Sequence, residues 1–124
     1  MDKVSFKIPG CPPSLNATYK VNYRTKCVYL DESVRNYKNQ AILFIPPFKI
    51  EPQEKVILTL EYHGKFFNND GTIKRRDVQN LDKCLCDLIF SKLGADDSCV
   101  WMISACKVED LEEYVQVTII KIGE

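Results

Sequence analysis

The sequence contains no apolar run long enough to cross a membrane, no internal repeat and no low-complexity stretch. Its net charge is zero, because 17 basic residues balance 17 acidic ones, so no overall field draws in nucleic acid. The first residues alternate and carry charge, which is not the pattern of a signal peptide. We therefore expect one domain over residues 1–124, located in the cytoplasm and without a membrane partner.

Histidine is nearly absent, and this argues against a histidine-based metal site. The one histidine, His63, falls on a predicted strand with no partner at ligand spacing. Cysteine is present, but Cys84 and Cys86 on a predicted helix would point to opposite sides, which is wrong for zinc. Structural zinc remains an alternative, and disulfides would need a secreted chain. We interpret all six cysteines as reduced thiols, mostly small core residues: Cys11, Cys27, Cys84, Cys86, Cys99 and Cys106.

The balanced total hides an uneven charge distribution. Residues 1–76 carry 13 Lys and Arg against 7 Asp and Glu, a formal charge of +6, whereas residues 77–124 carry 4 against 10, a formal −6. A basic half that binds a phosphate backbone beside an acidic half that holds metal suits a nuclease. The same division also suits a dimer held partly by charge.

Hydrophobic periodicity predicts strands at 4–8, 27–30, 56–62, 99–108 and 114–122 and helices at 32–44 and 78–93. A long polar loop carrying Lys20 and Arg24 is expected before residue 27, and the turn residues at 68–71 predict a hairpin with arms at 65–67 and 72–74. In the first helix, one face would carry Val34, Tyr37, Ala41 and Phe44. The order predicts an α+β domain with a mixed β-sheet backed by two helices.

The second predicted helix divides into an apolar and a polar face. Gly94 is placed to end it, and Asp82 would be a solvated carboxylate of its first turn. Asn80, Lys83 and Asp87 fall together on the polar face. The apolar stripe consists of Val78, Leu81, Leu85, Leu88, Ile89 and Leu93.

Residues 74–83, with Asp87 and then Asp96 and Asp97, concentrate the side chains that metal-assisted phosphodiester chemistry needs. Carboxylates hold a hard divalent cation, and Lys and Arg stabilise phosphate charge. The alternative is a solvated, charged helix start. Asp77 precedes the helix and Asp97 follows it, and a helix of ~16 residues spans ~24 Å. These carboxylates can meet only if the chain doubles back.

The run from Arg75 to Lys83, with Asp87 and residues 96–100 after it, resembles the signature of the RusA family of Holliday-junction resolvases. That signature is an Asp-x-Asp-Asn-x-x-Lys run, a helix and a paired Asp. The opening is also similar, with Ile8-Pro9, then Pro12-Pro13-Ser14 and Asn16, followed by a basic loop and a helix. The resemblance spans nearly the whole chain in the same order.

The resemblance implies a RusA-like, homodimeric endodeoxyribonuclease of DNA recombination and repair. Such an enzyme resolves four-way junction DNA by paired, symmetric nicks with Mg²⁺, or with Mn²⁺. Asp77 and Asp97 match its metal-binding and catalytic carboxylates, Lys83 its catalytic lysine and Asn80 the motif's asparagine.

One position departs from the motif, because Gln79 stands where the second aspartate is expected. Its amide oxygen can still bind a metal, but one negative charge is lost, and Mg²⁺ relies on carboxylates. Asp87, Asp96 or Glu61 could compensate as neighbouring carboxylates. The alternative is a weakened or inactive protein that binds junction DNA without cutting it.

Further residues are expected either to contact DNA or to lie in the core. Phe66 and Phe67 either wedge into base stacks or pack in the core or a dimer interface. Trp101 and Met102 are expected in the core. The candidate DNA-binding residues are Lys74, Arg75, Arg76, Asn80, Lys20 and Arg24.

Overall fold

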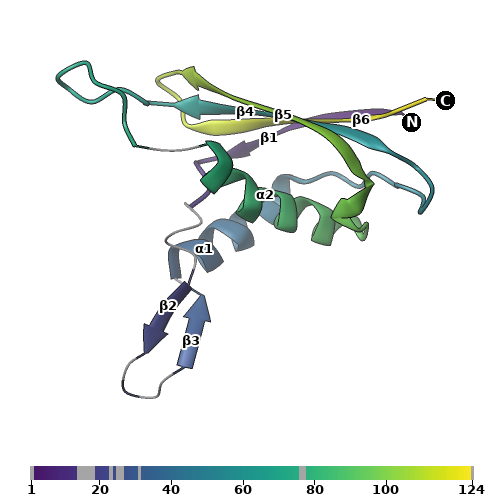
Figure 1. The fold of residues 1–124 in the computed structure, drawn as a ribbon, viewed down its shortest axis with the longest axis horizontal. Coiled ribbons are helices and arrows are strands. Elements are labelled where there is room, and N and C mark those ends of the chain that lie inside the picture. The colour runs from purple at the N-terminus through teal and green to yellow at the C-terminus, as the bar shows by residue number, and fades with distance from the viewer. Residues whose placement is uncertain are drawn as a thin grey trace.

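The computed structural model describes residues 2–13, 19–22, 24, 27–30, 32–75 and 78–123. A four-stranded sheet in the order β1-β6-β4-β5 forms the centre of the fold (Figure 1). Its strands are β1 (Lys3–Pro9), β4 (Val56–Gly64), β5 (Val100–Glu109) and β6 (Tyr114–Lys121). The pairs β1–β6 and β4–β6 are antiparallel, whereas β4–β5 is parallel. The sheet is therefore mixed, as predicted.

Two helices lie on the same side of this sheet, α1 (Glu32–Ala41) and α2 (Val78–Leu93) (Figure 1). Parallel strands need a long crossover connection, and α2 belongs to the one that joins β4 to β5. The helix bounds of α2 agree with the prediction. Its apolar stripe is also confirmed, because Leu81, Leu85 and Ile89 are at most 1% exposed.

Strand β4 shows which face of the sheet is covered. Its residues alternate in burial, and Leu58, Leu60 and Tyr62 are at most 1% exposed because they face the helices. The intervening residues 57, 59, 61 and 63 point to the opposite face, which neither helix covers (Figure 1). The core therefore lies in one layer between the sheet and the helices.

Several sequence expectations need correction. Residues of the expected polar loop form a strand, β2 (Tyr19–Asn22), which pairs with β3 (Cys27–Leu30) in a separate two-stranded ladder. The first helix ends at Ala41 and continues as the short 3-10 helix η2 (Ile42–Phe44). Phe44 is 47% exposed, because this change in helical period turns it away from the core. The 65–74 hairpin, by contrast, is confirmed in short form, because Phe67 and Ile73 form an antiparallel bridge and the amides of Lys74 and Asn68 donate to the carbonyls of Phe66 and Thr72.

No helix in the described part of the chain is long and apolar enough to span a membrane.

Candidate active site on helix α2

The chain doubles back directly after α2. Gly94 adopts φ +72°, a left-handed conformation that favours glycine. The amide of Gly94 donates to the carbonyl of Ser91, and the amide of Ala95 donates to that of Phe90, which closes the helix end as a Schellman motif. A 3-10 helix, η3 (Asp97–Cys99), follows at once and leads into β5. The chain therefore reverses direction at this point, while Asp77, which the sequence argument would bring to Asp97, lies outside the described residues.

Lys83 and Asp87 form an ion pair one turn apart on α2, with Lys83 Nζ 3.3 Å from Asp87 Oδ1. Both side chains are exposed. The pKa of Lys83 is raised, first by its hydrogen bond and charge interaction with Asp87 and further by the charge of Asp97. Asp97 is thus close enough to stabilise the charged lysine, although it lies beyond the end of the helix.

Three carboxylates surround a shallow hollow of about 260 Å³ beside this turn of the helix. Asp87 and Ser91 contribute from α2, and Asp96 and Asp97 contribute from the segment that turns back. Asp96 Oδ1 accepts a hydrogen bond from the Ser98 amide at 2.8 Å, which lowers the pKa of Asp96 and caps η3. Asp96 and Asp97 are both exposed and both line the hollow, and Asp96 is held by its bond to the backbone.

The predicted metal ligands are only partly placed. Arg76 and Asp77 lie outside the described residues, as do the side chains of Gln79 and Asn80. Among the residues that are described, no group of three or more His, Cys, Asp and Glu side chains is arranged to hold a metal ion. The hollow offers carboxylate oxygens, which are the type of ligand that a hard cation such as Mg²⁺ prefers. A complete ligand set would need Asp77, so the metal site stays a prediction.

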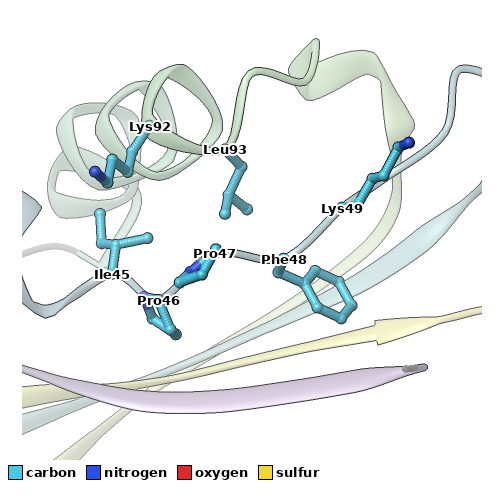
Figure 2. Close-up of a pocket in the computed structure, with 7 residues that line it drawn as sticks. All are labelled: Ile45, Pro46, Pro47, Phe48, Lys49, Lys92 and Leu93. Carbon is cyan, nitrogen blue, oxygen red and sulfur yellow. The ribbon is translucent and has the colours of Figure 1, made fainter.

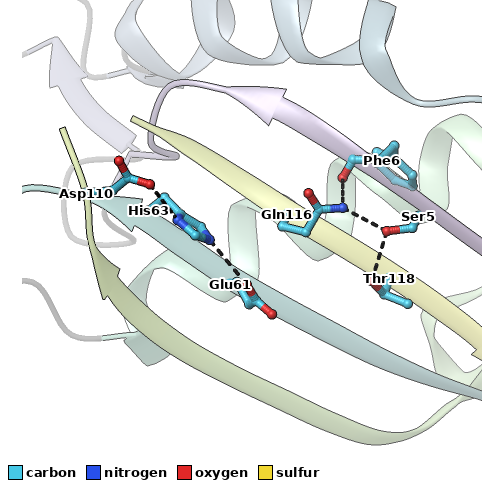
Figure 3. Close-up of polar contacts among 7 residues, drawn as sticks. All are labelled: Ser5, Phe6, Glu61, His63, Asp110, Gln116 and Thr118. Carbon is cyan, nitrogen blue, oxygen red and sulfur yellow. Dashed lines mark hydrogen bonds and ion pairs between the residues drawn. The ribbon is translucent and has the colours of Figure 1, made fainter. Parts of the chain in front are cut away.

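Glu61 does not belong to this site. It follows Leu60 on β4 and so points to the face of the sheet opposite α2. There, Glu61 Oε1 lies 3.2 Å from Nε2 of His63, and Asp110 Oδ2 lies 3.0 Å from Nδ1 of the same ring (Figure 3). The ring of His63 stacks on Tyr114 at 4.2 Å. Compensation for Gln79 by Glu61 is therefore wrong, whereas Asp87 and Asp96 lie on the correct side.

Asp82 has a role that the sequence did not indicate. It was expected to be solvated, but it is half-buried and accepts a hydrogen bond from the Tyr62 hydroxyl on β4. Burial raises the pKa of Asp82, and burial together with Asp82 raises the pKa of Tyr62. This bond ties the α2 turn that carries Lys83 to the sheet. The spacing of Asp82 four residues from Val78 and from Cys86, which places it beside apolar positions of the helix, was its only sequence signal.

The candidate DNA-binding residues are partly described. Arg24 and Arg75 are exposed and Lys74 is half-buried, whereas the side chain of Lys20 lies outside the described part.

Phe66 is 4% exposed and belongs to the core, with Lys107 Nζ 5.4 Å from its ring centroid. Phe67 is 50% exposed, so it is not a core residue.

Two further expectations concern the core and the cysteines. Trp101 and Met102 were expected in the core, and this is wrong, because they are 69% and 60% exposed on a strand at the sheet edge. None of the described cysteines is in a disulfide, as expected: Cys11, Cys84, Cys86, Cys99 and Cys106. Burial raises the pKa of Cys86 to about 12, so this thiol stays protonated at neutral pH.

Comparison with known families agrees with the resemblance. The family described as endodeoxyribonuclease RusA matches residues 9–120, which is nearly the whole chain. No curated protein matches the chain. The mixed four-stranded sheet with two helices is consistent with that family, which implies a nuclease that acts on Holliday junctions. On this match, the chain belongs to the endodeoxyribonuclease RusA family.

Proposed function

We propose that this protein is a homodimeric, divalent-metal-dependent endonuclease that resolves four-way DNA junctions by paired nicks. The observation that carries the proposal is the return of Asp97 to the α2 turn that holds Lys83 and Asp87. A charged lysine beside exposed carboxylates suits metal-assisted phosphodiester cleavage, because the carboxylates can hold a cation and the lysine can stabilise phosphate charge.

Each residue has a distinct role in this proposal. Asp97, with Asp77, would hold Mg²⁺, which when bound polarises a phosphate oxygen or activates water. Lys83 contacts the scissile phosphate and stabilises the developing negative charge. Asp87 keeps the Lys83 ammonium charged and limits its rotation through the 3.3 Å ion pair. Lys74, Arg75, Arg76, Asn80, Lys20 and Arg24 contact the DNA in the same proposal.

Gln79 makes a second function worth testing, a junction-binding protein with weak or no cleavage. One negative charge is missing from the motif, and Asp87 and Asp96 line the same hollow as Asp97. We propose that these two side chains add negative charge beside the metal without binding it directly. If they restore enough negative charge, the protein cuts with Mg²⁺; otherwise cleavage needs Mn²⁺ or is lost.

The test is nicking of a synthetic four-way junction against linear duplex, in Mg²⁺ and then in Mn²⁺. Wild type is compared with Asp77→Asn, Asp97→Asn and Gln79→Asp. Asp2→Asn is the matched control, because it removes the same charge from an exposed position before β1. We expect paired nicks in wild type, a loss of about 100-fold or more in both site variants, and no change in the control.

Each outcome separates the alternatives. Tight junction binding with cleavage only in Gln79→Asp would identify a binder that has lost its chemistry. Binding that falls steeply with salt marks real phosphate contacts. Neither binding nor cleavage by wild type, in either metal, would refute the proposed function.

A further inference from the structure

The 65–74 hairpin that follows β4 carries two exposed apolar side chains. In Figure 1 this hairpin projects beyond the end of β4. Phe67 and Ile73 face each other across its antiparallel bridge, and they are 50% and 67% exposed. Bridge partners point to the same face of a hairpin, so the two side chains form one apolar pair. Phe66 is buried, and neighbouring residues of a strand point to opposite faces, so this pair faces away from the core.

Hydrogen bonds hold the hairpin in a defined shape. The amide of Asn68 donates to the carbonyl of Thr72 at 2.7 Å. At the tip, Asp70 Oδ1 accepts hydrogen bonds from the amide of Thr72 at 3.0 Å and from its hydroxyl at 2.6 Å. At the base, the amide of Phe66 donates to Glu109 Oε1 at 2.6 Å. The apolar pair is therefore held in position, which lowers the entropic cost of binding a ligand.

The charges of the hairpin suit a polyanion. Residues 65–75 carry three basic side chains and one acidic side chain, a formal charge of +2. Lys74 and Arg75 stand next to each other on the arm that returns to α2. The carboxylates of Glu109 and Asp110 at the base are engaged within the protein, one by the hairpin backbone and the other by the histidine ring shown in Figure 3. An apolar pair beside cations matches DNA, which offers both base faces and phosphates.

The apolar pair is close along the chain to the proposed active site. Asp77 follows Ile73 by four residues, so the chain allows at most about 14 Å between their Cα atoms. Successive nucleotides of one strand are about 3.4 Å apart along a duplex, so this limit corresponds to about four nucleotides. A side chain of the pair that contacts bases therefore acts within a few nucleotides of the scissile phosphate.

The apolar hollow at the other end of α2 lacks these features. It has a volume of about 430 Å³, and its lining consists mainly of residues 45–49 and Leu93 (Figure 2). Phe48 is only 6% exposed, and Lys49 Nζ is paired with Glu51 Oε1 at 3.2 Å. The 16 residues of α2 place this hollow about 24 Å from the start of the helix. Of these two apolar surfaces, the hairpin pair is the one that can reach bases near the proposed site.

We propose that Phe67 and Ile73 form a wedge that inserts between base pairs at the branch point and makes the protein prefer four-way junctions to duplex. Proteins that unstack duplex DNA use Phe and Ile side chains in this way. The inference rests on the proposed function, because it names the part of the junction that this chain recognises. Unstacking a continuous duplex costs free energy, whereas stacking is already interrupted where four arms meet. The wedge therefore inserts more readily at the branch point than within an arm.

Fluorescence of 2-aminopurine tests the insertion, because this base analogue becomes brighter when it is unstacked. One synthetic junction carries the analogue beside the branch point, and a second carries it about one helical turn, or ten base pairs, away in an arm. Binding is measured without divalent metal, so that no strand is cut. At saturating wild-type protein we expect the branch-point signal to rise and the arm signal to stay unchanged. The Phe67→Ala, Ile73→Ala double variant should lose that rise at saturation.

Junction affinity supplies a second readout. The double variant should bind the junction about 10-fold or more weakly, with little change for linear duplex, because it loses stacking on bases. Phe44→Ala is the matched control, because Phe44 is 47% exposed on η2, and it should leave both readouts unchanged. Phe67→Trp should keep the fluorescence rise, because tryptophan also stacks on bases. Circular dichroism checks that each variant is folded.

Two results would overturn the wedge. The first is a saturated wild-type complex without a branch-point rise. The second is a double variant that keeps both the rise and the junction affinity. If that variant also changes its sedimentation, the apolar pair makes a contact between copies of the chain and not with bases.

Cleavage distinguishes failure of the wedge from failure of the proposed function. If wild type cuts junctions and the double variant cuts them with the same preference over duplex, the wedge is wrong and the endonuclease stands. If wild type raises the branch-point signal through Phe67 and Ile73 but cuts no junction in Mg²⁺ or Mn²⁺, the wedge stands and the endonuclease is wrong. Wild type that binds no junction would overturn both.

Discussion

The hydrogen bond from Tyr62 to Asp82 should stabilise the protein in a pH-dependent way. Tyr62 is 1% exposed, and Tyr62→Phe removes only the hydroxyl that donates to Asp82. At pH 7 the carboxylate is charged, and losing a hydrogen bond to a charged group costs about 1.5–3 kcal/mol. Because burial raises the pKa of Asp82, the group gains its proton at a higher pH than usual. Once the pH is low enough to protonate Asp82, the bond joins neutral groups, and its loss should cost only about 0.5–1.5 kcal/mol.

Urea unfolding followed by circular dichroism at pH 7 and pH 4 measures this difference. Tyr114→Phe is the matched control, since it removes the same atom from the sheet face that no helix covers; its effect should stay within about 0.5 kcal/mol. The Tyr62→Phe and Asp82→Asn double-mutant cycle isolates the pair. Equal losses at the two pH values, or a loss below about 0.5 kcal/mol at pH 7, would refute the reasoning.

Three further predictions concern α2 and the core. Asp87→Asn removes the main cause of the raised Lys83 pKa, so the alkaline decline of junction cleavage should move to lower pH; an unmoved pH profile would contradict this role. Gly94→Ala should destabilise the protein by about 1 kcal/mol in urea unfolding, because φ is +72° while nothing lies within 4 Å of the added Cβ. Leu60→Ala should cost about 2–5 kcal/mol in the same assay, against less than about 0.5 kcal/mol for exposed Leu43→Ala.

Local signals in the sequence were sufficient to predict where helix α2 begins and ends. Its apolar residues repeat with the helical period, and Gly94 permits the left-handed turn that ends it, so both bounds followed from neighbouring residues. The Lys83–Asp87 pair also follows from a spacing of four residues. Strand β4 could be predicted for the same reason, because β-branched and aromatic residues favour a strand locally.

The tertiary structure decided which distant residues meet and which faces remain open. Tyr62 reaches Asp82, and His63 reaches Asp110, only because β4 packs beside α2 and β5. The apolar character of Trp101 and Met102 suggested a core, but β5 lies at the sheet edge, and edge position is set by strand order. Residue type and hydrophobic periodicity reflect interactions over a few neighbouring residues, so they determined which segments of this protein form helices and strands. Strand order and chain reversal act over the whole chain, and they determined that Asp97 returns to Lys83 and that β5 is left exposed.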